Sequence, residues 1–300
     1  MEKKRNKADL GRIFAFYTEF KKRRGLSEGR SKMLAIIGGT GVYDLSIFDE
    51  WSEQTVSTPY GDTVVVLGKM DNKTVVFMTR HGKDHKIPPH KINYQANIFA
   101  LKSLGVESII ATTAVGSLRR DILPGTFVFC DQFLDFTKVR NHTFFDGPPH
   151  PVVHTDMSKP YCPELQKLLI KIAKDQELNY HSMGTYVCTE GPRFESAAEV
   201  AYYNQIGGTV VGMTGVPEVT LAREAEMCYT TVSMVTNLGT GLSENPLTHE
   251  EVLEIMADNQ NNFKNLISKA IHEWNPAPKG QCACPDALSE YGGFLKYFGK

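Results

Sequence analysis

The sequence has no long hydrophobic run, almost no net charge and no signal-peptide pattern. None of its 300 residues lies in a stretch apolar and long enough for a membrane helix, although 41% of them are hydrophobic. Its 33 basic and 34 acidic residues leave a net charge of −1, so no overall charge attracts nucleic acid or an anionic membrane. The six scattered cysteines, with no signal peptide, predict reduced thiols in the cytoplasm. We expect a soluble cytoplasmic protein that binds neither nucleic acid nor membrane.

The charge that is present is unevenly placed. Residues 1–32 hold eleven Lys or Arg against four acids, a surplus of +7, and an apolar patch between Leu10 and Phe20 has near-helical spacing. A peripheral contact with membrane or nucleic acid is one interpretation of this segment. The other is an appended terminus, because a first buried strand begins near Met33. We favour the second, which predicts a peripheral extension over 1–32 and a single domain over 33–300.

Strand and helix patterns alternate along the rest of the chain. Short β-rich runs predict strands at 34–37, 63–67, 73–78, 108–113, 185–188, 209–213 and 229–235. Amphipathic or capped segments predict helices at 90–104, 163–178, 195–206 and 248–271, and one that Pro217 opens. Alternation of this kind is typical of an α/β protein, in which ligands collect at the ends of strands.

Small polar residues and glycines follow several of these strands. Gly39, Thr40 and Gly41 present backbone N–H groups and a hydroxyl to an anion, but Asp44 occupies the position where a dinucleotide fingerprint needs glycine. Arg80 and His81 follow another strand. The forked donors of arginine match the oxygens of phosphate, and the neighbouring histidine adds a donor whose protonation an anion would favour. An Arg-His pair is more often a surface feature, but its position at a strand end favours a phosphate site.

Two groups of residues suggest metal ligands only weakly. His81, His85 and His90 have spacings that match no standard site and lie in a Lys- and Pro-rich loop. Cys282 and Cys284 form a Cys-x-Cys pair, which alone supplies too few ligands for zinc. The sequence therefore predicts no metal and no cofactor.

Several motifs resemble one known family. These are IIGGTGVYD, TRHG, KINYQANIFALKSLG, TTAVGSLRRDILPG, EGPRFES and MTGVPEV with LARE, in this family's order between Leu34 and Ala270. They resemble the purine nucleoside and methylthioadenosine phosphorylases. The resemblance implies a three-layer α/β/α fold with a mixed, twisted sheet, and catalysis in which inorganic phosphate is a co-substrate.

The resemblance also implies roles for individual residues. The phosphate site it implies consists of Thr40, Arg80, His81, Thr113, Ala114 and Thr214. The substrate site consists of Phe194, Glu195, Met213, Asn237, Gly239 and His249, with His154 supplied by a neighbouring subunit. Asn237, Glu195 and His81 are the candidates for direct roles in catalysis. Since His154 lies in a long aromatic loop that crosses subunits in trimeric relatives, we expect a homotrimer.

Three positions bear on the choice of base. The methylthioadenosine enzymes place Asp-x-Asp where this chain has Asn237, Leu238 and Gly239, typically Ser where it has Glu195, and an apolar residue where it has His249. A carboxylate accepts from N1–H of hypoxanthine or guanine, which adenine lacks, and a carboxamide can donate to a 6-oxo group. Glu195 as a helix cap, Asn237 as a turn residue and His249 as a first-turn helix residue are the structural alternatives.

Together these observations predict phosphate-dependent cleavage of a purine nucleoside, with a 6-oxopurine such as inosine or guanosine preferred. The products would be the free base and ribose 1-phosphate. S-methyl-5'-thioinosine and S-methyl-5'-thioadenosine remain alternative substrates, because the MTGVPE motif is closer to the methylthio branch. A nucleoside hydrolase or a non-catalytic nucleoside-binding protein is a more remote alternative, since neither needs a phosphate site.

Overall fold

The chain forms one mixed sheet covered by helices on both faces. The computed structural model describes residues 32–39, 45–71, 73–243, 249–276 and 280–298. Within them the strands are β1 (Met33–Gly38), β2 (Glu50–Thr58), β3 (Gly61–Met70), β4 (Lys73–Thr79), β5 (Val106–Ser117), β6 (Phe127–Phe129), β7 (Gln132–Phe136), β8 (Tyr180–His181), β9 (Thr185–Thr189), β10 (Val210–Gly212) and β11 (Cys228–Leu238). The α-helices are α2 (Tyr94–Leu104), α3 (Pro163–Asp175), α4 (Ala197–Gln205), α5 (Gly215–Glu224), α6 (His249–Asp258), α7 (Gln260–Glu273) and α8 (Leu295–Phe298).

The sheet has eleven strands in the described part of the chain, in the order β2-β3-β4-β1-β5-β10-β9-β7. β11 pairs with β5 and β6, and β6 also pairs with β8. The ladders of β1 with β4, β1 with β5, and β5 with β11 are parallel, whereas β2, β3 and β4 form antiparallel neighbours. The sheet is therefore mixed, as expected from the resemblance.

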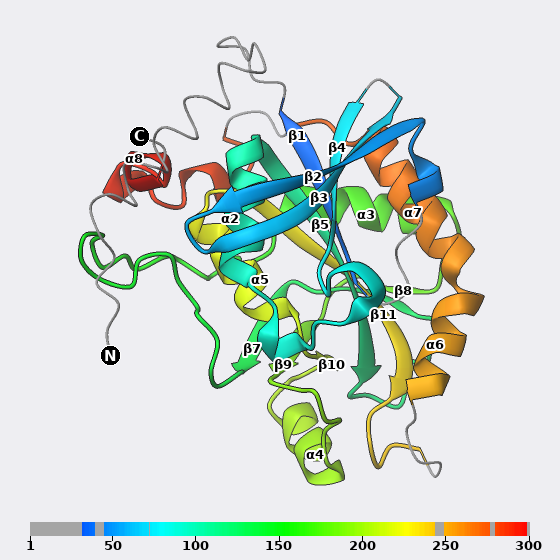
Figure 1. Ribbon diagram of the computed structural model, residues 1–300. Coiled ribbons are helices and arrows are strands. Elements are labelled where there is room, and N and C mark those ends of the chain that lie inside the picture. Colours follow the sequence, from blue (N-terminus) through cyan, green and yellow to red (C-terminus); the bar gives the residue numbers. More distant parts are fainter. Residues whose placement is uncertain (1–31, 40–44, 72, 244–248, 277–279, 299–300) are drawn as a thin grey trace.

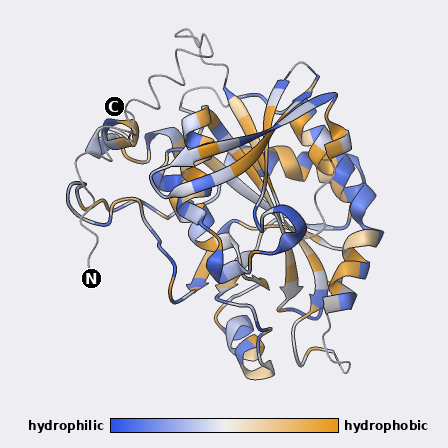
Figure 2. Cartoon of the chain, in the orientation of Figure 1, coloured by the Kyte–Doolittle hydropathy of each residue, from blue (hydrophilic) through white to orange (hydrophobic). Residues whose placement is uncertain are grey.

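The two faces of the sheet carry separate hydrophobic layers because side chains alternate along each strand. In β1, Ala35 and Ile37 pack in a cluster that includes residues of α2 and α5. Leu34 and Ile36 pack on the other face, in a cluster that includes residues of α3 and α7. Figure 1 shows the sheet between these helices, and the hydropathy colouring of Figure 2 shows hydrophobic residues along the strands and on the helices that cover them. The three-layer α/β/α prediction is confirmed.

Local capping explains where two of the helices begin and end. Asn93 precedes α2, and its Oδ1 accepts from Ala96 N at 3.1 Å. Gly105 ends the same helix with φ 91°, a left-handed conformation that suits glycine. Ser196 precedes α4 and forms a capping box with Glu199, since each side chain accepts from the other residue's backbone N–H.

Some expectations from the sequence differ from the structure. The single helix predicted over 248–271 is two helices, α6 and α7, separated at Asn259, whose φ is −101°. The strands β2, β6, β7 and β8 were not predicted. The predicted extension over 1–32 lies outside the described residues except for Lys32. No helix in the described ranges is both long and apolar enough to cross a membrane.

The long segment between β7 and α3 packs against its own chain. Phe144 and Phe145 are buried, with rings 5.2 Å and 6.3 Å from that of Phe294 in the C-terminal segment. These two aromatic side chains are therefore covered by their own chain, so their burial is no evidence for a second subunit. Val139 and Val152 in the same segment are 76% and 67% exposed.

Candidate active site

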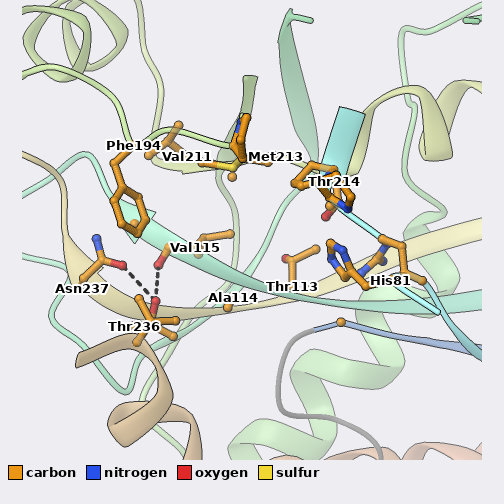
Figure 3. A pocket seen from close by; sticks show the side chains of 18 of the residues that line it. His81, Thr113, Ala114, Val115, Phe194, Val211, Met213, Thr214, Thr236 and Asn237 are labelled. Atoms are coloured by element: carbon orange, nitrogen blue, oxygen red, sulfur yellow. Dashed lines mark hydrogen bonds between the residues drawn. The ribbon is translucent and has the colours of Figure 1, made fainter. Parts of the chain in front are cut away.

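A cavity of about 470 Å³ opens where β4, β5 and β11 end, beside β10. This volume is in the range of small-molecule binding sites. Ten of the predicted site residues line it: Arg80, His81, Thr113, Ala114, Phe194, Glu195, Met213, Thr214, Asn237 and Gly239. Figure 3 shows Phe194 and Asn237 toward one end and His81, Thr113 and Thr214 toward the other, with Ala114 between them. The cavity therefore has two chemically different ends.

The cavity lies where β5 changes neighbours. Its parallel ladder with β1 ends at Ala111, and its antiparallel ladder with β10 begins at Gly116. Thr113, Ala114 and Val115 fall between these ladders and line the cavity. Ligands in open α/β sheets bind at such switch points, where the separating strands leave a crevice.

Arg80 is buried beside His81, in the part of the cavity that the sequence predicts to bind phosphate. Most of its guanidinium N–H groups donate to other residues of the protein. Its Nε and Nη2 donate to the two carboxylate oxygens of Glu218 at 2.7 and 2.8 Å, and its Nη1 donates to Thr112 O at 2.9 Å. Burial alone would lower the pKa of Arg80, but the charge and hydrogen bonds of Glu218 raise it above its ordinary value. Three of the five N–H groups are occupied, which leaves one on each Nη nitrogen for an anion.

Only part of the guanidinium fork of Arg80 is therefore available to an anion. Glu218 lies on α5, 138 residues away in the sequence, and is itself only 1% exposed. Tyr229 also donates its hydroxyl to Glu218 Oε1 at 2.8 Å. The carboxylate fixes the guanidinium in place and neutralises most of its charge.

His81 is held as a neutral imidazole. Its Nδ1 lies 2.8 Å from the carbonyl oxygen of Ile87, so we assign the ring proton to Nδ1. Burial, the charge of Arg80 and the neighbouring His85 lower the pKa of His81 to about 4. Near pH 7, Nε2 is therefore an acceptor, suited to the P–O–H proton of hydrogen phosphate. The sequence instead suggested that His81 would act as a donor.

Two threonine hydroxyls and the N-terminus of α5 complete the predicted phosphate site. Thr113 Oγ1 donates to Ser233 Oγ at 2.9 Å, and because hydroxyls rotate, Ser233 can become the donor and release Thr113 for an anion. Thr214 precedes α5, and its side chain makes no capping bond to that helix. The N-terminus of a helix favours a nearby anion. Thr40, the remaining predicted phosphate ligand, lies outside the described residues.

Gly39 brings the end of β1 close to this site. Its N–H donates to Thr112 Oγ1 at 2.8 Å. A Cβ at this position would lie 2.4 Å from Thr112 O and 3.0 Å from Arg80 Nη1, so any larger residue would displace the strand or the arginine. Close approach of Thr112 and Arg80 therefore requires glycine at position 39.

Glu195 faces the cavity without capping a helix. Ser196 and Glu199 form the cap of α4, which removes the structural alternative considered for Glu195. Thr189 Oγ1 donates to Glu195 Oε1 at 2.7 Å, so the other carboxylate oxygen remains for a ligand. Burial raises the pKa of Glu195 above its ordinary value, and the hydrogen bond from Thr189 opposes that change.

Asn237 is positioned by a β-bulge near the end of β11. Val235 pairs with Val115 and Asn237 with Gly116, so Thr236 is an extra residue in the ladder. The Thr236 hydroxyl donates to Asn237 Oδ1 at 2.9 Å, as Figure 3 shows, and Asn237 Nδ2 donates to Leu238 O at 3.0 Å. Nδ2 keeps one N–H, and Oδ1 keeps capacity to accept a second bond.

The remaining predicted substrate contacts have mixed outcomes. Phe194 and Met213 line the cavity, and Phe194 is 39% exposed. His249 begins α6, but its side chain lies outside the described residues. His154 is exposed, and its backbone N–H donates to the Tyr291 hydroxyl at 3.2 Å. It is not among the residues that line this chain's own cavity.

The structure adds residues that sequence reasoning missed. Lys86 and Val252 line the cavity, and Glu218 supports Arg80 from outside it. The only signal for Glu218 in the sequence is an acidic residue next to Pro217 on a largely apolar helix. Such a residue is ordinarily a first-turn charge, so its buried partner could not be inferred.

The fold is that of an α/β protein, and its cavity is lined by the side chains that the sequence predicted for a phosphate site and a purine site. The phosphorylase superfamily matches the sequence over residues 33–272, so the chain belongs to that family. It is 52% identical over 261 residues to a 6-oxopurine nucleoside phosphorylase of Pyrococcus furiosus, covering 85% of this chain and 97% of the relative. This similarity confirms the family predicted from the motifs.

Other relatives carry the names of the methylthio branch. An S-methyl-5'-thioadenosine phosphorylase of Saccharolobus solfataricus is 46% identical over 267 residues, covering 88% of this chain and 98% of the relative. A solved methylthioadenosine phosphorylase from an antarctic soil metagenomic library superposes with a TM-score of 0.79 at 36% identity, covering 87% of this chain and 92% of that one. The fold class and the enzyme family are therefore established. Because the relatives are named for different purine nucleosides, the base that this chain prefers depends on the residues of its own site.

Proposed function

We propose that this chain catalyses the phosphorolysis of purine nucleosides, with 6-oxopurine nucleosides such as inosine and guanosine preferred. The products are the free base and ribose 1-phosphate. The observation that carries the proposal is one cavity that Arg80 and Glu195 line, with His81, Thr113 and Thr214 toward one end and Asn237 toward the other. One end suits phosphate and the other a purine, and Met213 lines the cavity as a candidate contact for the ribose.

The arrangement supports an in-line displacement at the sugar. A phosphate oxygen attacks C1′ while the N-glycosidic bond breaks, and the bonding electrons pass to the purine. Arg80 and the two threonines direct donors at the phosphate, and His81 Nε2 accepts a hydrogen bond from its P–O–H group. Asn237 stabilises the leaving purine by a hydrogen bond at N7 or O6. In a shielded cavity one well-placed donor contributes about 2.7–4 kcal/mol to stabilising the transition state.

The choice of a 6-oxopurine rests on Glu195 and Asn237. With Thr189 bonded to Oε1, the ionised Glu195 offers Oε2 to N1–H of hypoxanthine or guanine. Adenine has no proton on N1, so two acceptors would face each other. The remaining N–H of Asn237 suits O6. A site whose own polar groups are left unpaired by the wrong substrate can reject it by about 10⁴-fold.

S-methyl-5'-thioinosine is the second candidate substrate, with S-methyl-5'-thioadenosine as its 6-amino counterpart. The observation that favours a methylthio group is Val252, an apolar residue of α6 that lines the cavity and is 7% exposed. A 5′-hydroxyl would need a polar partner there, and His249 remains the candidate.

The decisive experiment compares inosine, guanosine, adenosine, methylthioinosine and methylthioadenosine, each with and without phosphate, by release of the base. We expect base release only with phosphate and the highest kcat/KM for a 6-oxopurine substrate. Release at the same rate without phosphate would indicate a hydrolase. Binding of a nucleoside without release of its base would indicate a non-catalytic protein. Equal kcat/KM for adenosine and inosine would contradict the proposed preference for 6-oxopurines.

We also propose a cytoplasmic homotrimer in which His154 reaches the cavity of a neighbouring subunit, with no metal or other cofactor in the reaction. The exposed His154, together with Val139 and Val152 on the same segment, supports a subunit contact there. Light scattering on the purified protein tests the assembly. A monomer with full activity would contradict it, as would unchanged kinetics in His154→Ala.

A further inference from the structure

Four cysteines that are distant in the sequence meet at one point. Cys162 immediately precedes α3, Cys228 is the first residue of β11, and Cys282 and Cys284 lie in the C-terminal segment. All four Sγ atoms lie within 4.8 Å of one another. The Cys-x-Cys pair alone had too few ligands for a metal, and the fold supplies two more.

The spacing of the four thiols matches a tetrahedral site. Zinc binds thiolate sulfur at about 2.3 Å, which places the corners of a tetrahedron about 3.8 Å apart. Cys228 Sγ and Cys282 Sγ are 3.5 Å apart, and the largest separation in the group is at most 4.8 Å. Small side-chain movements therefore bring all four sulfurs to metal-binding distance, and four protein ligands leave no open position for a substrate.

The surroundings are those of a closed structural site. Cys162, Cys228 and Cys284 are at most 4% exposed, whereas Cys282 is partly exposed and offers a path for an ion. Cys162 stands at the N-terminus of the thirteen-residue helix α3, where the helix dipole favours a thiolate. Simple apolar packing of thiols would not require four of the six cysteines, from three separate parts of the chain, to converge.

We propose that Cys162, Cys228, Cys282 and Cys284 bind one divalent zinc-class metal ion with a structural role. On binding, each thiol releases its proton to solvent and donates a sulfur electron pair to the ion, so four protons leave and no atom is oxidised or reduced. The ion ties the C-terminal segment to the starts of β11 and α3. The same segment carries Phe294, which packs on Phe144 of the long loop, so the anchor also supports that loop.

The site acts on stability and not on the reaction. Cys228 and Asn237 are nine residues apart on β11, and at about 3.3 Å per residue the cysteines lie about 30 Å from the base end of the cavity. Removing the ion is expected to shorten the half-life of activity at high temperature and to change the initial rate at room temperature by less than about twofold.

The test measures metal in the full-length protein, purified with a phosphine reductant and without chelators. We expect about one zinc per chain by elemental analysis, and Co²⁺ exchanged into the wild-type protein should give intense tetrahedral d–d bands with thiolate-to-cobalt charge transfer. The double variant Cys282→Ser, Cys284→Ser should lose both signals. Cys130→Ser, which changes a buried cysteine outside the group, should keep them.

Three results would overturn the proposal. The first is a reduced wild-type protein that binds neither Zn²⁺ nor Co²⁺ after incubation. The second is a denatured, unreduced protein whose intact mass is lower by two or four hydrogens, with these thiols closed to alkylation, because the group would then consist of disulfides. The third is an equal loss of thermal stability on adding a chelator to wild type and to the double variant.

Discussion

Replacing Glu195 by glutamine tests the proposed base recognition most directly. The substitution keeps the size of the side chain and removes its charge. Thr189 donates to Oε1 at 2.7 Å, so the amide oxygen is expected to remain at Oε1 and the NH₂ group to take the position of Oε2. That position would then present a donor in place of an acceptor, which opposes N1–H of hypoxanthine and suits N1 of adenine.

The expected effect is large. A hydrogen bond from N1–H to a charged group contributes about 1.5–3 kcal/mol, and relieving two opposed acceptors contributes about 1–3 kcal/mol. The lower limits add to about 2.5 kcal/mol, which corresponds to about a 60-fold fall in the inosine-to-adenosine ratio of kcat/KM. Initial rates with both nucleosides at saturating phosphate measure this ratio.

The matched control is Glu199→Gln, which changes a nearby glutamate in the first turn of α4. Glu199 pairs with Arg193 at 2.7 Å and caps α4, and it is not among the residues lining the cavity. We expect its variant to keep the wild-type ratio. If Glu195→Gln cleaves inosine normally and shifts the ratio by less than about threefold, Glu195 does not select the base.

Lowering the pH should change the inosine-to-adenosine ratio of the wild-type enzyme in the same direction as Glu195→Gln does. Burial raises the pKa of Glu195, so its neutral form appears at a higher pH than for an ordinary glutamate. The neutral carboxyl can donate to N1 of adenine, whereas the carboxylate that accepts from N1–H is lost. The inosine-to-adenosine ratio is therefore expected to fall as pH falls. Phosphate ionisation affects both substrates and cancels in the ratio, and a ratio that rises on acidification would contradict the argument.

Three other substitutions are informative. Glu218→Gln leaves buried Arg80 without its counter-ion, so the free energy of unfolding should fall by about 3–5 kcal/mol. Phosphate should stabilise this variant more than wild type in thermal denaturation, and equal stabilisation would count against the pairing. With a folded-state pKa of about 4, His81 should cost wild type about 3 kcal/mol between pH 6.5 and 4, because only the unfolded chain takes up its proton. Urea denaturation should show this loss in wild type and not in His81→Gln. Asn237→Asp should lower the inosine-to-adenosine ratio, since a carboxylate accepts from the adenine amino group, and an unchanged ratio would exclude this role.

The position of the site could be predicted because it depends on local patterns. β-rich runs followed by glycine and threonine placed Thr113, Thr214 and Asn237 at strand ends, and parallel strands bring such ends together. The same reasoning located Arg80 after β4. Each inference needed only the residues within one strand and the turn after it.

Other features depend on contacts that no local pattern contains. The partner of Arg80 is 138 residues away, and only the folded sheet brings α5 beside the end of β4. The bulge at Thr236 could not be predicted, because β11 is buried on both faces and its sequence has no regular apolar-polar alternation that a bulge would interrupt. The break at Asn259 was missed because the apolar spacing continues from α6 into α7. Strands β6 and β8 have three and two residues, too few for a periodic pattern.

The charges at the phosphate end lead to a last prediction. Glu218 compensates Arg80, His81 is neutral near pH 7, and Lys86 pairs with Asp84 at 3.1 Å. We therefore expect phosphate to be held by directed N–H and O–H donors in a shielded cavity, with little uncompensated positive charge nearby. Added salt screens exposed charges far more than buried hydrogen bonds.

The KM for phosphate should accordingly change by less than about twofold between about 0.05 M and 0.5 M salt, where the Debye length shortens by roughly a factor of three. The measurement uses saturating inosine in sodium chloride and again in sodium gluconate, because a rise confined to chloride would mean competition for the anion site. A rise of about tenfold in both salts would show that net charge, and not the geometry around Arg80, Thr113 and Thr214, holds the phosphate.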